Sequence, residues 1–181
     1  MRDIITQRAL ELFDRRGYYG AAIRDICEAS GCKMPTLYYY FANKDELFDQ
    51  VVRVQFEELV DRLESEIPAG LSLEEACAYR IVQKKGLSDK DRLVYRLAIK
   101  TWVGLEGCEL IRLKMALWDR ARGSRCRKPF ADAGYSRAWI KFIARSVANL
   151  DARIVLLDEN PPDEEIRETV AGIFAAAKSR G

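Results

Sequence analysis

Apolar side chains recur every three to four residues along most of the chain, the spacing that puts them on one face of a helix. In the first such stretch, residues 5–13 supply the apolar face, and Gly17 is the residue type that commonly ends a helix in the left-handed conformation. A second short helix is expected over residues 23–31, although Ala22 before it is a poor helix cap. The N-terminal stretch therefore predicts short helices separated by glycines.

A third helix is predicted directly after the second glycine, where the chain reads CKMPTLYYYFANK. Pro35 suits the first turn of a helix, because its missing N–H would have no partner there and its φ is already fixed. Leu37 and Phe41 are four residues apart and can share one buried face. Tyr38 and Tyr39 then lie off that face, so the helix is expected to expose two phenols.

The helical pattern restarts at Asn43, whose side chain can cap the next helix, with Glu46 in the position that completes a capping box. The three short helices before it form a candidate helix-turn-helix unit. Further helices are predicted over residues 44–66, 73–83, 88–102, 105–122, 136–157 and 163–178. Residues 123–133 are predicted to form a polar, basic loop. Because no segment shows a strand pattern, the predicted fold class is all-α.

The composition excludes more functions than it suggests. The 181 residues are 49% hydrophobic, enough for a sizeable core, and the net charge of +2 is by itself no argument for a nucleic-acid ligand. There is no histidine, which removes the commonest general base and a favoured metal ligand. Five cysteines at irregular spacing are expected to be reduced core residues, and Cys27 and Cys32 do not have the spacing of a zinc site. We therefore expect no metal, no cofactor and no enzymatic activity.

The N-terminus leads at once into an amphipathic helix and shows no signal peptide. No apolar run approaches the length that crosses a membrane. The expected location is the cytoplasm, with no membrane contact.

Three stretches between Leu12 and Phe48 resemble the tetracycline-repressor (TetR) family of transcriptional regulators. They read LFDRRGY at 12–18, IRDICEASG at 23–31 and PTLYYYFANKDELF at 35–48. The resemblance implies a three-helix helix-turn-helix DNA-binding domain over residues 1–48. It also implies that residues 49–181 form a helical domain for effector binding and dimerisation.

The resemblance also assigns DNA-contacting roles to individual residues. Tyrosine hydroxyls of the third helix would donate to phosphate oxygens, which fixes the register of the protein on DNA without reading sequence. At the start of that helix, Thr36 would offer a hydroxyl and a methyl to base edges, and Met34 would offer apolar contact to thymine methyls. Arg24 can pair with a phosphate or a guanine, or can be a solvated side chain. The candidate DNA-binding residues are Arg24, Lys33, Met34, Pro35, Thr36, Tyr38, Tyr39, Tyr40 and Lys44.

The C-terminal region is rich in large aromatic side chains, which either fill a core or line a ligand pocket between helices. The family resemblance favours a pocket for a small apolar or aromatic effector. Its candidate residues are Tyr79, Tyr95, Trp102, Cys108, Trp118 and Trp139. The last two predicted helices carry apolar residues on several faces, and in this family such a pair forms a four-helix bundle with its copy in a second subunit. A homodimer of this kind would read a palindromic operator in double-stranded DNA.

The resulting hypothesis is a dimeric DNA-binding regulator, a repressor released from its operator by the effector. Two alternatives stay open. One is a DNA-binding regulator without a small-molecule effector, controlled by a protein partner or by its own concentration. The other is a helical scaffold protein in which the helix-turn-helix unit is incidental.

Overall fold

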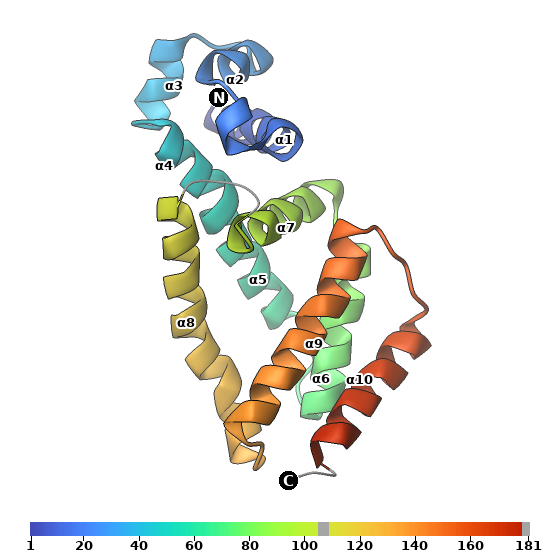
Figure 1. The fold of residues 1–181 in the computed structure, drawn as a ribbon. Helices are drawn as coiled ribbons and strands as arrows, with labels where there is room; N and C mark the ends of the chain where they lie inside the picture. The colour runs from blue at the N-terminus through green and yellow to red at the C-terminus, as the bar shows by residue number, and fades with distance from the viewer. Residues whose placement is uncertain (105–108, 179–181) are drawn as a thin grey trace. The chain divides into compact units, whose positions relative to one another are not determined.

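The computed structural model describes residues 1–104 and 109–178, apart from the side chains of residues 124–126. Every regular element in these residues is a helix (Figure 1), which confirms the predicted all-α fold class. The α-helices are α1 (Arg2–Gly20), α2 (Ile23–Ser30), α3 (Met34–Tyr40), α4 (Lys44–Asp49), α5 (Gln55–Ser65), α6 (Leu73–Gln83), α7 (Asp89–Trp102), α8 (Glu109–Asp132), α9 (Arg137–Leu156) and α10 (Asp163–Lys178). There is also a π-helical turn, η1 (Gln50–Val54), and a 3-10 turn, η2 (Lys84–Gly86).

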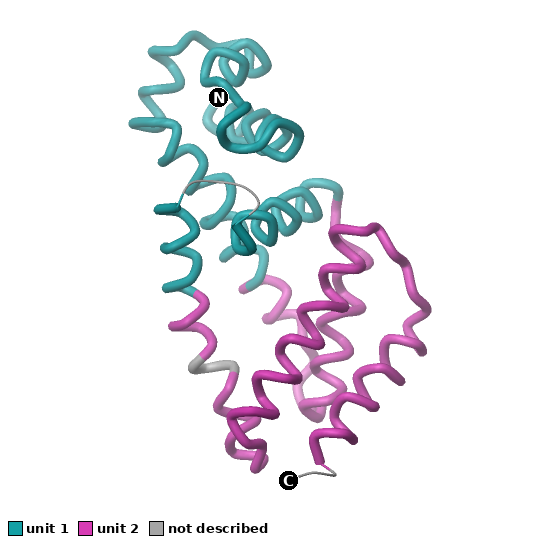
Figure 2. The backbone as a smooth tube through the Cα atoms, in the orientation of Figure 1, with its two compact units in different colours: residues 1–60, 89–118 teal, residues 61–88, 119–181 magenta. Residues whose placement is uncertain are grey.

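The helices pack into two compact units, which Figure 2 shows in different colours. Unit 1 contains residues 1–60 and 89–118, and unit 2 contains residues 61–88 and 119–181. Helix α7 and the first part of α8 therefore pack with the N-terminal helices, although α6 precedes them in the sequence. The predicted domains, residues 1–48 for DNA binding and residues 49–181 for effector binding and dimerisation, were defined by function. They stay a prediction, because the two units describe only how the helices pack.

Aromatic side chains hold the N-terminal helices of unit 1 together. Phe13 of α1 packs edge-on against Phe48 of α4, with ring centroids 4.9 Å apart, and Tyr18 packs against the same ring at 5.0 Å. Both phenylalanines are fully buried. Because full burial of a phenylalanine contributes about 1.5–3 kcal/mol, this cluster ties α1 firmly to α4.

Two glycines end helices in unit 1 as the sequence predicts. Gly17 has φ 69° and ψ 174°, so the regular part of α1 ends there and only a short turn continues to Gly20. Gly31 has φ 63° and ψ 28° directly after α2, in the left-handed region that is unfavourable for residues with a Cβ. Ala22, before α2, makes no side-chain cap, as expected for alanine.

The long helix predicted over residues 44–66 is present as α4, η1 and α5 in succession. The sequence pattern does not predict the π turn, which adds one residue to a helical turn and so shifts the apolar face. Val51 and Val52, adjacent in the chain, are both fully buried within it. Arg53 in the same turn donates to both carboxylate oxygens of Asp49, each at 2.8 Å. The π turn is thus fixed by buried apolar side chains and a bidentate ion pair.

The predicted loop over residues 123–133 is wrong. Helix α8 continues through almost all of this stretch, with Pro129 inside it. Gly123 and Pro129 disfavour a helix, but the arginines and lysine between them favour one. The Arg127 guanidinium also lies over Gly123, where a Cβ would come within 2.8 Å of Nη1. The predicted start of this helix at residue 105 lies outside the described residues.

Unit 2 consists of the end of α5, α6, η2, the later part of α8, α9 and α10. The predicted cap at Ser136 is confirmed, since its hydroxyl accepts a backbone N–H from the first turn of α9 at 3.4 Å. A buried ion pair joins Lys84 of η2 to Asp151 of α9, with Nζ and Oδ1 3.1 Å apart. Because breaking a buried ion pair is costly, the pair fixes η2 against α9. Within the described ranges, none of the helices has the length and apolar character needed to cross a membrane.

Candidate nucleic-acid interface

Helix α3 is anchored by one face and exposed on the other. Leu37 and Phe41 are fully buried, as their spacing predicts. On the other side, Tyr39 is 83% exposed, Met34 45% and Tyr38 44%. A cluster of large exposed side chains on one short helix commonly marks a binding surface. This side of α3 is therefore the candidate nucleic-acid interface.

The start of α3 presents a short basic and polar turn. Lys33 is the N-cap residue, with extended backbone (φ −93°, ψ 155°) and no side-chain cap bond, and its side chain is exposed. Pro35 lies in the first turn, as predicted, and is exposed as well. The Thr36 N–H donates to the Lys33 carbonyl at 2.9 Å, and the Thr36 side chain is half-buried. The fold thus brings together on one turn four of the candidate DNA-binding residues, since Met34 lies between Lys33 and Pro35.

The corner between α3 and α4 is built around Asn43. Its Oδ1 accepts the Glu46 N–H at 2.8 Å, which confirms the predicted cap. The Glu46 carboxylate accepts the N–H of Ala42 at 2.6 Å, one residue before the position that a capping box uses. Together the two bonds fix where α4 begins after α3.

Lys44 lies over an aromatic ring at this corner. Its Nζ is 4.5 Å from the centre of the Tyr18 ring, a cation–π contact that contributes about 0.5–1 kcal/mol at an exposed site. The Tyr18 hydroxyl in turn donates to the Asp45 carboxylate. Burial lowers the pKa of the Lys44 ammonium, and the Asp45 charge opposes this only in part. The ordinary lysine pKa lies so far above neutrality that Lys44 keeps its charge, and Tyr18 holds that charge at the corner.

Three further side chains belong to these helices. Tyr40 is half-buried and packs edge-on against Tyr39, with ring centroids 5.0 Å apart. Arg24 is exposed in the first turn of α2. Tyr19 is almost fully exposed and packs edge-on against Tyr18 at 5.1 Å. Tyr19 was not among the predicted residues, although an aromatic residue between two glycines without apolar partners at helical spacing is a usable signal of exposure.

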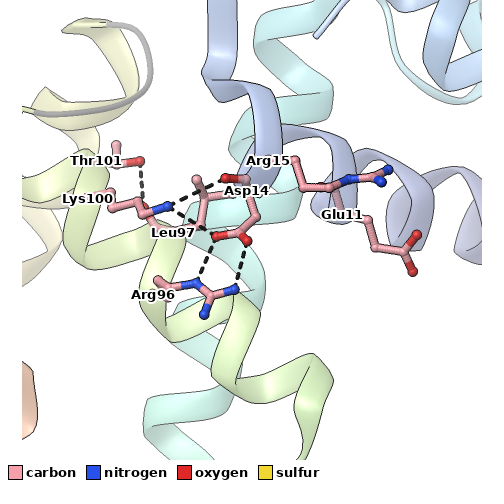
Figure 3. Close-up of polar contacts among 7 residues, drawn as sticks. All are labelled: Glu11, Asp14, Arg15, Arg96, Leu97, Lys100 and Thr101. Carbon is pink, nitrogen blue, oxygen red and sulfur yellow. Dashed lines mark hydrogen bonds and ion pairs between the residues drawn. The ribbon is translucent and has the colours of Figure 1, made fainter. Parts of the chain in front are cut away.

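A charged cluster that the sequence did not predict joins α1 to α7 (Figure 3). The Asp14 carboxylate accepts hydrogen bonds from Arg96 Nε at 2.9 Å and Nη2 at 2.7 Å, and lies 3.3 Å from Lys100 Nζ. Burial raises the pKa of the Asp14 carboxyl, but the bonds and charges of Arg96 and Lys100 outweigh burial and hold the pKa below its ordinary value. Asp14 is therefore ionised at neutral pH and links α1 to α7.

Residues 5–51, from α1 into η1, match the family model of the bacterial regulatory proteins of the tetR family. The N-terminal region of this chain is therefore a TetR-family domain. Among curated relatives, the helix-turn-helix-type transcriptional repressor ComR of Escherichia coli K12 is 38% identical over 74 residues, which are 41% of this chain and 33% of that protein. The match thus spans about a third of the relative's own length.

The fold of the whole chain is similar to that of solved structures. A TetR-family transcription regulator from Marinobacter aquaeolei VT8 has a TM-score of 0.72 at 15% identity, over 97% of this chain and 94% of that one. The multidrug binding protein EbrR, solved with imidazole, has a TM-score of 0.68 at 20% identity, over 95% of this chain and 88% of that one. At such identities the likeness is one of fold.

Three of the predicted effector residues lie in unit 1. Phe56, which was not among the predicted residues, brings Tyr95 and Trp118 together, with ring centroids 5.2 Å and 5.7 Å from its own. Tyr95 is buried, so this cluster is packed. Trp102 is exposed at the end of α7. Cys108 lies outside the described residues.

The other two predicted effector residues, Tyr79 and Trp139, lie in unit 2. Tyr79 of α6 borders a cavity of about 380 Å³. Trp139 packs edge-on against Phe142 of the same helix, with ring centroids 5.4 Å apart. A second cavity, of about 220 Å³, is lined by residues of α6, α8 and α9, among them Arg80, and by none of the predicted effector residues. The predicted set is therefore not gathered around one cavity of unit 2.

The part of the chain that the structure describes offers no metal site. It contains no group of three or more histidine, cysteine, aspartate or glutamate side chains placed to hold an ion. Cys27 and Cys32 are both free thiols at the end of α2, and no such third ligand joins them.

Proposed function

We propose that this chain is a DNA-binding transcriptional regulator that inserts α3 into the major groove of double-stranded operator DNA. The observation that carries the proposal is the exposed turn of Lys33 to Thr36 next to exposed Tyr38 and Tyr39, on a helix whose other face is buried. The major groove admits an α-helix and displays a distinct pattern for each base pair. In this arrangement Lys33 to Thr36 read base edges, whereas the two phenols and Lys44 bind phosphates and set the register. Operator DNA as the ligand implies action in the cytoplasm.

The proposed assembly is a homodimer through α9 and α10. Phe142 on α9 is 46% exposed and Leu157 at its end is 67% exposed. Phe142 also borders an open hollow together with Leu150 of α9 and Ile173 of α10. A second copy of this face would cover these apolar side chains. The resulting two-fold axis would present two copies of α3 to half-sites about 34–36 Å apart, hence to a palindromic operator.

The proposed regulator is a repressor that a small apolar or aromatic molecule releases from DNA. The cavity of about 380 Å³ beside Tyr79 is within the size range of small-molecule sites. The curated relative ComR is named a repressor, and the structural neighbour EbrR is named a multidrug binding protein. An effector would act only through its different affinity for the DNA-competent and DNA-incompetent conformations, typically about 1–3 kcal/mol of coupling.

Selection of bound duplexes from a random library at about 50 mM salt tests DNA binding, because phosphate contacts are strongest at low salt. Enrichment of a palindrome supports a dimeric regulator. Failure to retain any duplex under these conditions overturns the proposal and favours the scaffold alternative.

A thermal-shift screen of small molecules, run with and without the selected duplex, tests the effector. A compound that raises the melting temperature of the protein and releases the duplex identifies both the effector and the sign of regulation. A regulator that keeps its duplex in the presence of every stabilising compound is the effector-free alternative.

A further inference from the structure

The end of α2 carries two cysteines in a backbone arrangement that brings their side chains together. The Cys32 N–H donates to the Cys27 carbonyl at 3.0 Å, and the Gly31 N–H donates to the Glu28 carbonyl at 3.1 Å, around Gly31 in the left-handed conformation. These two bonds define a Schellman motif, in which the side chains at the positions of Cys27 and Cys32 commonly make an apolar contact. In this chain the contacting pair consists of two thiols.

The two thiols differ in accessibility. Cys27 is buried, whereas Cys32 is partly exposed. Burial, together with the charge and hydrogen bonding of the neighbouring Cys32 thiol, raises the pKa of the Cys27 thiol to about 11. Cys27 is therefore kept protonated, and Cys32 is the sulfur that a small oxidant in solution reaches first.

We propose that Cys27 and Cys32 form a reversible disulfide on exposure to hydroperoxides and that this disulfide weakens DNA binding. In the first step the Cys32 thiolate attacks a peroxide oxygen, the O–O bond breaks, hydroxide leaves and Cys32 becomes a sulfenic acid. In the second step the Cys27 sulfur attacks the Cys32 sulfur, the S–O bond breaks and the leaving hydroxyl takes the Cys27 proton as water. Overall the two thiols lose two electrons to one hydrogen peroxide, giving one disulfide and two waters.

The disulfide acts on the start of α3. A disulfide holds its sulfurs about 2.05 Å apart, closer than any non-bonded contact between thiols. Cys27 is packed in the interior and has little room to move, whereas Cys32 lies in the turn directly before Lys33, the N-cap of α3. Closing the bond therefore draws this turn toward α2 and displaces the first residues of α3. The loss of affinity rests on the proposed function, which assigns those residues to base edges.

The chain offers a direct readout of the disulfide. Trypsin cleaves after Arg24 and Lys33, so both cysteines fall in one peptide, DICEASGCK. After hydrogen peroxide treatment of the full-length protein, this peptide should lose the mass of two hydrogens and regain it with dithiothreitol. In parallel, affinity for the duplex selected from the random library should fall at least about tenfold, the loss expected when one or two base contacts are disturbed, and should recover on reduction.

Variants of the pair separate the disulfide from general oxidation. Cys32→Ser and Cys27→Ala should bind the duplex in reduced buffer and keep that affinity in peroxide. Cys77→Ala removes a buried cysteine outside the pair and should stay peroxide-sensitive. If the buried substitution Cys27→Ala prevents folding, Cys32→Ser alone tests whether the disulfide causes the loss of affinity, because it replaces the more exposed residue.

Three results would overturn the inference: an unchanged peptide mass, a disulfide that leaves DNA affinity unaltered, or a Cys32→Ser protein that still loses affinity in peroxide. Failure of the reduced protein to bind any duplex overturns the proposed function instead, because the peptide mass reports the disulfide without DNA.

Discussion

The contact of Asp14 with α7 is open to a quantitative test through Asp14→Asn. The Asp14 carboxylate is 11% exposed and its partner Arg96 is 24% exposed, so water screens the pair only in part. The amide keeps the shape of the side chain but removes the negative charge that Arg96 and Lys100 both contact. From the strength of charge-assisted hydrogen bonds, we expect a loss of about 2–3 kcal/mol in the free energy of unfolding. For a chain of this length that loss lowers the melting temperature by about 4–12 °C.

Urea unfolding of the full chain at pH 7 measures this loss, with Glu11→Gln as the matched control. Glu11 lies on the same helix and pairs with Arg8 at 2.9 Å, but both side chains are much more exposed than those of the Asp14 pair. An exposed pair contributes about 0.2–1 kcal/mol, so the control should lose less than 1 kcal/mol. A loss for Asp14→Asn no greater than that for Glu11→Gln would show that the Asp14 pair is no stronger than an exposed ion pair.

The pH dependence supplies a second check. Because the folded-state pKa of Asp14 is lowered, the unfolded chain binds the proton more tightly than the folded chain does. The contribution of the carboxylate is fully present above the unfolded carboxyl pKa of about 3.9 and is lost as pH falls through the folded-state pKa. The difference in unfolding free energy between wild type and Asp14→Asn should therefore be constant from about pH 5 to 7 and shrink at lower pH. A difference that stays constant in acid would contradict the ion pair.

Three further variants test other parts of the structure. Tyr38→Phe combined with Lys44→Ala should weaken binding to all duplexes alike and make the affinity depend less on salt, as measured by titration at several salt concentrations. A loss of affinity confined to one sequence would contradict phosphate contacts. Gly31→Ala should lower the free energy of unfolding by about 1–2 kcal/mol, because φ is 63° there, and an unchanged urea midpoint would count against that strain. Phe142→Glu should give a monomer in sedimentation; a dimer that survives places the interface elsewhere than this part of α9.

The helix-turn-helix unit could be predicted from the sequence because its boundaries depend on local preferences. Gly17 and Gly31 end helices through their own backbone freedom, and Asn43 starts one through its own side chain. None of these signals needs a distant partner. Local preferences gave the wrong prediction at residues 123–133, because Gly123 does not end the helix there. Helix α8 continues through it, and the Arg127 guanidinium lies over Gly123.

The candidate interface was predictable for the same reason, whereas the contacts behind it were not. Leu37 and Phe41 are buried because their four-residue spacing puts them on one helix face, which leaves Tyr38 and Tyr39 outside. Asp14 also lies on the polar face of its helix, and no local pattern distinguishes an aspartate in water from one paired with a residue of α7. Such pairs become visible only when the tertiary fold is known.

The π turn η1 sets the rotational phase of α5 relative to α4. Each residue of an α-helix adds about 100° of rotation, so the same residues wound as a regular α-helix would rotate everything after this turn by about that angle. Phe56 follows the turn and packs on Tyr95 and Trp118. In a regular α-helix of the same length Phe56 would therefore point away from these rings, whereas the wider π turn absorbs the added residue and keeps Phe56 against them. The π turn thus sets which face of α5 meets the aromatic cluster of Tyr95 and Trp118. It does so through backbone geometry rather than through the side chains at either end.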